Sequence, residues 1–177
     1  LTAGKLRSTK GQCQITLDDL ETFHPGLLAI AYFNPQAEEH CLTAALNHLK
    51  ALFDTDRLSL RLTNNYQANA ARDTTLVVQL AKQLTLPLVA TNDVYYHVAE
   101  RRPLQDVLTC IRLGLKIDTA GFHLSPNAER YLKSPQEVCR LFQKYPQSIK
   151  RTLDIAERTR PFSLEQLTYQ YPEEICP

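Results

Sequence analysis

The first ninety residues alternate between short apolar runs and amphipathic stretches, and this order restricts the fold more than any other feature. Three apolar runs are typical of buried strands, at residues 27–33, 58–62 and 86–91. Two amphipathic stretches between them are typical of helices, residues 36–53 and the segment that carries Leu76, Val77, Leu80 and Leu84. Because each helix leads into the next strand through a short turn, the order predicts an α/β fold with parallel pairing.

The remainder of the chain is predicted to be helical. Pro103 suits the first turn of a helix that ends at Gly114. Its apolar positions are expected to be buried, namely Leu104, Val107, Leu108 and Ile111. Ser134 and Pro135 begin a second helix as a capping box. A third helix follows Pro146, with Ile149, Leu153 and Ala156 expected to face inward.

The amino-terminal segment is polar up to residue 14 and is expected to form an edge hairpin or a loose arm. Thr16 then caps a helix whose first turn is acidic, which suits the positive end of the helix dipole. Asp54, Thr55 and Asp56 are expected to break the helix that precedes the second strand.

Charge and composition exclude several classes of protein. Twenty basic and nineteen acidic residues give a net charge of +1, which argues against a strongly basic nucleic-acid domain but allows a local basic groove. No apolar run approaches the length of about 18–20 residues needed to cross a bilayer. The five cysteines show no CxxC spacing and the five histidines no HExxH pattern, so no metal motif is predicted.

Polar residues follow the third predicted strand at Asn92, Asp93 and His97. In parallel α/β folds, chemistry takes place at the carboxyl ends of the strands, where these side chains are expected to lie. Asp93 could therefore bind a metal ion, and His97 could join it. A strand-end aspartate also serves as a loop or helix cap, so both roles stay open.

Several blocks of sequence carry a resemblance to a known family. They are "ITLDDLETFHPGLLAI" from Ile15, "PLVATNDVYYH" up to His97, "RRPLQDVLTCIR", "ERYLKSPQEVCRLF" and "IAERTRPFSLEQLTYQYPEE" up to Glu174. In this order they resemble the PHP (polymerase and histidinol phosphatase) domain of bacterial DNA polymerase III alpha subunits, the error-prone paralogues above all.

The resemblance implies a partial fold. The family fold is a distorted (β/α) barrel, and residues 1–160 correspond to its C-terminal two-thirds, with a helical C-terminal part. Residues 161–177 would be a connector toward an absent polymerase palm. The sequence contains no methionine, not even at position 1, which agrees with a piece of a longer protein.

The resemblance also implies a metal site. The intact family site binds up to three divalent metals, such as zinc, manganese or magnesium, through histidine and carboxylate side chains. In some members it supports phosphoesterase or 3′–5′ exonuclease activity. Asp93 matches one ligand of the late Asn-Asp-x-His motif, but Tyr95 occupies the histidine position, and a neutral phenol is a poor ligand.

A second family motif, in the middle strand, also differs from the family pattern in this chain. Relatives read roughly Glu-x-x-Arg-His, where this chain has Arg61, Asn64 and Asn65. An arginine beside a cation site would repel the metal. The resemblance therefore predicts a decayed site in which Asp93 is vestigial and His97 a weak substitute ligand. No cofactor is expected in this segment alone.

Surface charges have two interpretations. Arg102 and Asp106 stand four apart, which predicts a local ion pair. Lys144, Lys150 and Arg151 could contact DNA phosphate or another polymerase domain, or form an ordinary solvated helix face.

Three hypotheses for function follow. The first is a non-catalytic segment of an error-prone DNA polymerase, a nucleotidyltransferase of the bacterial cytoplasm that acts in replication and repair. The second is an active metal-dependent phosphoesterase or proofreading exonuclease. The third is a protein-interaction module. The expected partners are the palm and thumb of the parent chain and, through the parent, DNA, but no membrane. The isolated segment is expected to be inactive and only marginally stable on its own, and to dimerise or swap elements so that its unpaired sheet edge is covered.

Overall fold

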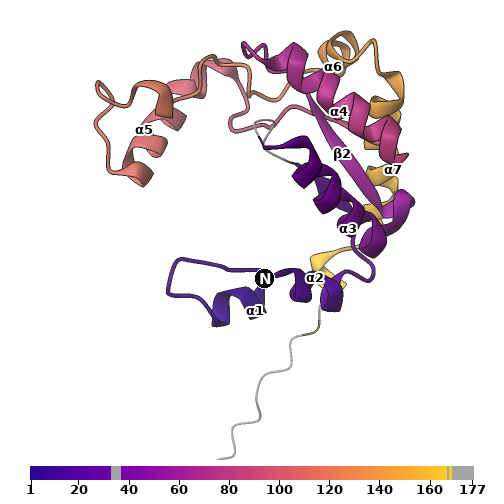
Figure 1. Ribbon diagram of the computed structural model, residues 1–177. Coiled ribbons are helices and arrows are strands. Elements are labelled where there is room, and N and C mark those ends of the chain that lie inside the picture. The colour runs from indigo at the N-terminus through magenta and orange to yellow at the C-terminus, as the bar shows by residue number, and fades with distance from the viewer. Residues whose placement is uncertain (33–36, 167, 169–177) are drawn as a thin grey trace, which may run out of the picture.

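The fold centres on a small parallel sheet. The computed structural model describes residues 1–32, 37–166 and 168. Its three strands are β1 (Ala29–Ala31), β2 (Leu58–Thr63) and β3 (Leu88–Thr91), in the order β1-β2-β3 (Figure 1). Both pairings are parallel, with Ala29 opposite Leu58 and Leu60 opposite Leu88. The sequence-based prediction of a parallel α/β fold is confirmed, and within the described residues the sheet is open rather than closed into a barrel.

Helices connect and cover the strands. The longer ones are α3 (Glu39–Arg57), α4 (Ala70–Leu84), α5 (Arg102–Leu113) and α7 (Pro146–Thr159). The shorter ones are α1 (Thr2–Leu6), α2 (Leu17–Phe23), α6 (Pro135–Leu141) and the 3₁₀ turns η1 (Ala99–Arg101), η2 (Gly121–His123) and η3 (Leu164–Gln166). No described helix combines the length and the apolarity that a bilayer crossing requires.

Two expectations for the amino-terminal part need correction. The segment 1–14 contains the short helix α1 rather than a hairpin, and Arg7 ties it to α2 through an ion pair of 2.7 Å with Asp19. The predicted strand run 27–33 ends at Phe33, which lies outside the described residues; within them, β1 covers three residues of the run, and its Ile30 is 46% exposed rather than buried. Among the described strands, β1 lies at the edge of the sheet and pairs with β2.

The helix ends follow the predicted signals. Thr16 accepts a hydrogen bond from the backbone of Asp19, and the Asp19 carboxylate accepts one in return, which completes a capping box. Ser134 accepts from the backbone of Glu137, but the Glu137 side chain turns to Tyr131 instead, so this box is half formed. Gly114 ends α5 in the left-handed conformation, with φ of 67°.

The core lies along one face of β2. Leu58, Leu60 and Leu62 alternate along the strand and are at most 1% exposed. They belong to one apolar cluster with residues of α3, α4 and the α6–α7 region, including Leu46, Phe53, Leu80, Leu84 and Phe142. The alternation read from the sequence therefore places the hydrophobic face correctly.

The predicted break before β2 is present at Asp54. This residue has φ of 57° inside α3, and its carboxylate accepts hydrogen bonds from the backbone N–H groups of Asp56 and Arg57, at 2.8 and 2.9 Å. The carboxylate thereby begins a new turn that delivers the chain into β2. These bonds to the charged form hold the pKa of Asp54 below its usual value, with the Arg57 backbone the largest cause.

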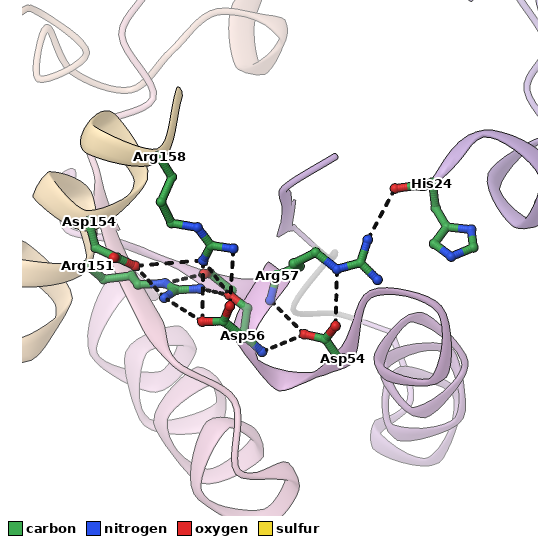
Figure 2. Close-up of polar contacts among 8 residues, drawn as sticks. His24, Asp54, Asp56, Arg57, Arg151, Asp154 and Arg158 are labelled. Carbon is green, nitrogen blue, oxygen red and sulfur yellow. Dashed lines mark hydrogen bonds and ion pairs between the residues drawn. The ribbon is translucent and has the colours of Figure 1, made fainter. Parts of the chain in front are cut away.

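An ion network fastens α7 to this junction (Figure 2). Arg151 donates to the Ser59 hydroxyl at 3.0 Å, to the Asp154 carboxylate at 2.6 Å and to the backbone oxygen of Asp56. Arg158 pairs with the Asp56 carboxylate at 3.2 Å. The Arg151 side chain is only 13% exposed, so it is not part of a solvated helix face and instead joins α7 to the start of β2.

The apolar faces of two C-terminal helices differ from the prediction. Leu104, Val107, Leu108 and Ile111 of α5 are 44–71% exposed, and Cys110 is the buried residue of this helix. In α7, Leu153 is 66% exposed and Ala156 is also exposed. The buried residue of α7 is Ser148. The prediction for Ile149 is confirmed, since it packs against the core, whereas Leu153 and Ala156 of α7 are exposed and the described residues leave the apolar face of α5 uncovered.

We expect Arg151→Met to lower the free energy of unfolding by about 1–3 kcal/mol, because it leaves the buried Ser59 hydroxyl without its partner. Urea titration followed by circular dichroism measures the change. Arg160→Met is the matched control, since Arg160 makes an i,i+3 pair with Glu157 on the same helix but is 76% exposed. The control should change stability by less than about 0.5 kcal/mol. Equal losses in both variants would contradict the role given to Arg151.

Candidate functional site

The carboxyl ends of the strands converge on a small pocket of about 120 Å³. The polar side chains that line it are Tyr32, Arg61, Thr63, Asn65, Gln67, Asp73, Thr74, Asp93 and Arg130. Arg61 lies on β2 and Asp93 follows β3, so parallel pairing brings them to the same edge. The sequence-based prediction of the location of the polar cluster agrees with this pocket.

Asp93 is held between two guanidinium groups. Arg61 approaches one carboxylate oxygen at 3.4 Å and Arg130 approaches the other at 3.2 Å. All three side chains are about one-fifth exposed, at 20–22%. Asp93 has φ of 49°, an uncommon conformation for a residue with a side chain, and it turns the chain directly after β3. The carboxylate is therefore committed to two cations on the protein itself.

Two tyrosines brace these arginines from outside. The Arg61 guanidinium lies 3.6 Å from the ring centroid of Tyr32, and the Arg130 guanidinium lies 4.7 Å from that of Tyr95. Each pair has the geometry of a cation–π contact. Tyr95, which stands at the histidine position of the family motif, thus contacts a second cation rather than a metal position.

Arg130 reaches the site because its loop is anchored on both sides. The backbone oxygen of Arg130 accepts from Tyr95 N–H at 2.9 Å, and the Asn92 side chain donates to the backbone of Glu129 and Tyr131. Tyr131 also forms an isolated bridge with Tyr96. These bonds align the loop beside the end of β3.

A buried lysine stabilises the same loop. The Lys133 side chain has no exposed area and pairs with Glu129 at 2.7 Å, and with Glu137 at 3.7 Å. Burial acts to lower the pKa of Lys133, but the hydrogen bonds to Glu129 and Tyr131 outweigh it and raise the pKa. Hydrogen bonding to Glu137, followed by burial, raises the pKa of the Tyr131 phenol. The cluster thus surrounds one buried cation with two carboxylates and supports the loop that carries Arg130.

Among the described residues, those at the strand ends do not fit a divalent cation. A metal ion needs several oxygen or nitrogen ligands with free lone pairs. Of the pocket residues, Asp93 has both oxygens engaged by cations, and Arg61 and Arg130 would add repulsion. Asp73 is the other carboxylate in the pocket, and it lies in the first turn of α4.

The other predicted site residues differ in how they lie relative to Asp93, Arg61 and Arg130. His97 is exposed and, like Tyr95, is not among the described residues that line the pocket. Asn65 does line it and is 7% exposed, with a side-chain oxygen that has no hydrogen-bond partner within the described part of the chain. Asn64 instead donates to the backbone oxygen of Leu141 at 3.5 Å.

Sequence reasoning missed the role of Arg130. Arg130 is part of the block "ERYLKSPQEVCRLF", but nothing in the order of residues shows that it meets Asp93. The predicted ion pair of Arg102 and Asp106 is confirmed, at 3.4 Å. Arg102 also donates to the backbone oxygen of Ser125 at 2.7 Å, which ties α5 to the loop that leads toward Arg130.

A second cluster of metal-binding residue types lies at the start of α3. Glu38, His40 and Cys41 approach one another, and all three are exposed. The two contacts use opposite ring nitrogens of His40, with Glu38 near Nδ1 and Cys41 near Nε2, both at 3.3 Å. One ion can bind only one of these nitrogens, so the arrangement in the structure is a chain of contacts rather than a chelate.

Comparisons with known proteins identify relatives. Error-prone DNA polymerase 1 of Agrobacterium fabrum is 42% identical over 174 residues, which cover 98% of this chain. Error-prone DNA polymerase 2 of Rhizobium meliloti is 41% identical over 174 residues, again 98% of this chain. The error-prone DNA polymerase of Caulobacter vibrioides is 39% identical over the whole chain. The chain is homologous to one segment of error-prone DNA polymerases.

The homologous segment is a minor part of each relative. The chain spans 16% of the length of each of these three polymerases. No protein-family model matches the chain. The homology agrees with the resemblance to error-prone polymerases that the sequence blocks carry.

We expect Asp93→Asn to lower the free energy of unfolding by about 1–3 kcal/mol, because it leaves the guanidiniums of Arg61 and Arg130 without their shared carboxylate. Combined with Arg130→Gln in a double-mutant cycle, it should show a coupling energy of at least about 0.5 kcal/mol. Urea titration measures all variants. Asp118→Asn, at an exposed turn, is the control and should be neutral. The absence of a coupling energy in this cycle would contradict the ion pair between Asp93 and Arg130.

Proposed function

We propose that this chain is a non-catalytic structural segment of an error-prone DNA polymerase, which serves DNA synthesis and repair through its parent protein. The observation that carries the proposal is the position of Asp93. It matches a ligand of the resembling family, and two guanidiniums of this chain engage its carboxylate. The positive charge that metal ions would supply at such a site comes here from Arg61 and Arg130.

The finer assignment is that residues 1–160 are the C-terminal two-thirds of a PHP-type domain, with 161–177 as a connector toward the polymerase palm. The parallel order of three strands, with a helix between successive strands, supports this assignment. Homology to error-prone polymerases supports it as well, because the resembling sequence blocks belong to that class.

The alternative is a metal-dependent phosphoesterase or 3′–5′ exonuclease at the same strand ends. This activity needs a metal ion that polarises phosphate and generates a hydroxide. Asp93 would have to leave both arginines before it could bind such an ion, and Tyr95 and Asn65 offer neutral groups in place of histidines. The geometry therefore favours the structural role.

A measurement of metal content distinguishes the structural role from the phosphoesterase. The purified 177-residue chain, incubated with zinc or manganese and then desalted, is expected to retain no more metal than its Asp93→Asn variant in elemental mass spectrometry. Hydrolysis of a diaryl phosphate is expected to be equal for both proteins and at background. Stoichiometric metal that disappears in Asp93→Asn, together with hydrolysis, would establish the phosphoesterase instead.

The apolar face of α5 supports a packing role. This helix extends away from the sheet (Figure 1), and its exposed side chains include Leu104, Val107, Leu108 and Ile111. Four large apolar residues on one helix face are unfavourable in water unless another surface covers them. The palm and thumb of the parent polymerase are the proposed partners, because the chain represents 16% of the length of its relatives.

We expect Ile111→Ser to change the stability of the 177-residue chain by less than about 0.5 kcal/mol, because Ile111 is 71% exposed. In a polymerase that contains this segment, the same change should lower the melting temperature. Leu80→Ser is the control, since Leu80 is fully buried and its loss should destabilise both proteins. An unchanged polymerase would argue against docking through α5.

A further inference from the structure

A second, larger groove adjoins the pocket around Asp93, and both are lined by Gln67 and Thr74. It has a volume of about 700 Å³ and runs between the first half of α4 and the turn that joins α6 to α7. One wall is the loop after β2 with α4, and the other is the end of α6 and the turn. The side chains used below are Tyr66, Gln67, Thr74, Arg140, Lys144 and Tyr145.

The charged side chains that line this groove are all positive. Arg140 and Lys144 both line it, and none of its described lining residues is acidic. Both cations are exposed, and neither takes part in an ion pair within the described part of the chain. A chain of net charge +1 therefore presents a local basic groove, which suits a ligand with repeated negative charges.

Aromatic rings stand beside these cations. Tyr66 is 52% exposed and has φ of 50°, a strained conformation for a bulky residue of the kind that concentrates at functional sites. Arg140 donates to the Tyr66 hydroxyl at 3.2 Å and so bridges the two walls. Tyr145 lies on the opposite wall and is half-buried. Two rings and two cations thus border one groove.

We propose that this groove binds a short run of single-stranded DNA. Sites for single strands combine cations that follow the phosphates with aromatic rings on which bases stack. Gln67 and Thr74 add neutral hydrogen-bonding groups, and the volume is large enough for one or two nucleotides. The groove chemistry is shared with RNA, and the choice of DNA rests on the polymerase function proposed above.

Fluorescence anisotropy with a labelled octamer of deoxythymidylate tests the proposal. The 177-residue chain should bind it saturably, with a Kd of about 10⁻⁴–10⁻⁶ M at low salt. Neutralisation of two phosphates by Arg140 and Lys144 predicts a slope of log K against log salt near about −1.4. The slope should fall by about one half in Lys144→Gln, because one of the two cations is removed.

Matched variants separate stacking from charge. Tyr66→Phe keeps the ring and should bind within about twofold of the wild type, whereas Tyr66→Ala should weaken binding about fivefold or more. Arg140→Gln should weaken binding by a similar factor. Lys82→Gln is the control, because Lys82 is an exposed lysine in the last turn of α4 and does not line the groove. Melting curves confirm that every variant is folded.

Several outcomes would overturn the proposal. They are the absence of saturable binding, unchanged affinity in Tyr66→Ala and Arg140→Gln, and an equal loss in Lys82→Gln. An octamer of glutamate carries similar charge without bases, and equal affinity for it would make the groove a site for acidic protein segments. Tighter binding of the corresponding uridylate octamer would reassign it to RNA. Metal content and the Ile111→Ser variant test the proposed polymerase role independently of DNA binding. Failure of the groove proposal can therefore be told apart from failure of the proposed function.

Discussion

The two faces of β2 determine where every other described part of the α/β unit is placed. Leu58, Leu60 and Leu62 fill one face and form the core with α3 and α4. Ser59 and Arg61 alternate with them and point to the other face, because successive strand residues face opposite sides. Ser59 meets Arg151 of α7, and Arg61 meets Asp93 after β3. The same strand therefore carries both the apolar core contacts and the polar contacts to α7 and to Asp93.

Arginine side chains join several pairs of segments in this chain. Arg7 ties α1 to α2, Arg57 donates to the backbone of His24 near the end of α2, and Arg151 ties α7 to β2 (Figure 2). Arg130 joins a distant loop to the strand ends. A guanidinium has five donors in a planar fork, so one side chain can satisfy several acceptors from different elements.

The same property allows two arginines from different segments to engage one carboxylate at the strand ends. Arg61 from β2 and Arg130 from a loop each approach one oxygen of Asp93. Tyr32 and Tyr95 cover the guanidinium faces. The basic groove beside Tyr66 differs in kind, because its cations have no carboxylate partner in the described lining. This difference is the basis for proposing a structural role for the first cluster and a binding role for the second.

The sequence by itself determined the features that depend on neighbouring residues. Caps at Thr16 and Gly114, the break at Asp54 and the alternation of β2 follow from local hydrogen bonds and from the period of the chain. The polar residues after β3 were located for the same reason, since strand direction fixes which ends meet.

Only the tertiary structure decided which apolar faces are covered and which charges meet. Periodicity marked the apolar face of α5, but Ile111 stays exposed because burial depends on what packs against a helix. Arg130 reaches Asp93 through a loop held by Asn92 and Lys133, and such long-range contacts leave no local pattern. Local order thus fixes the elements, whereas the partners of their side chains arise from packing between segments far apart in the chain.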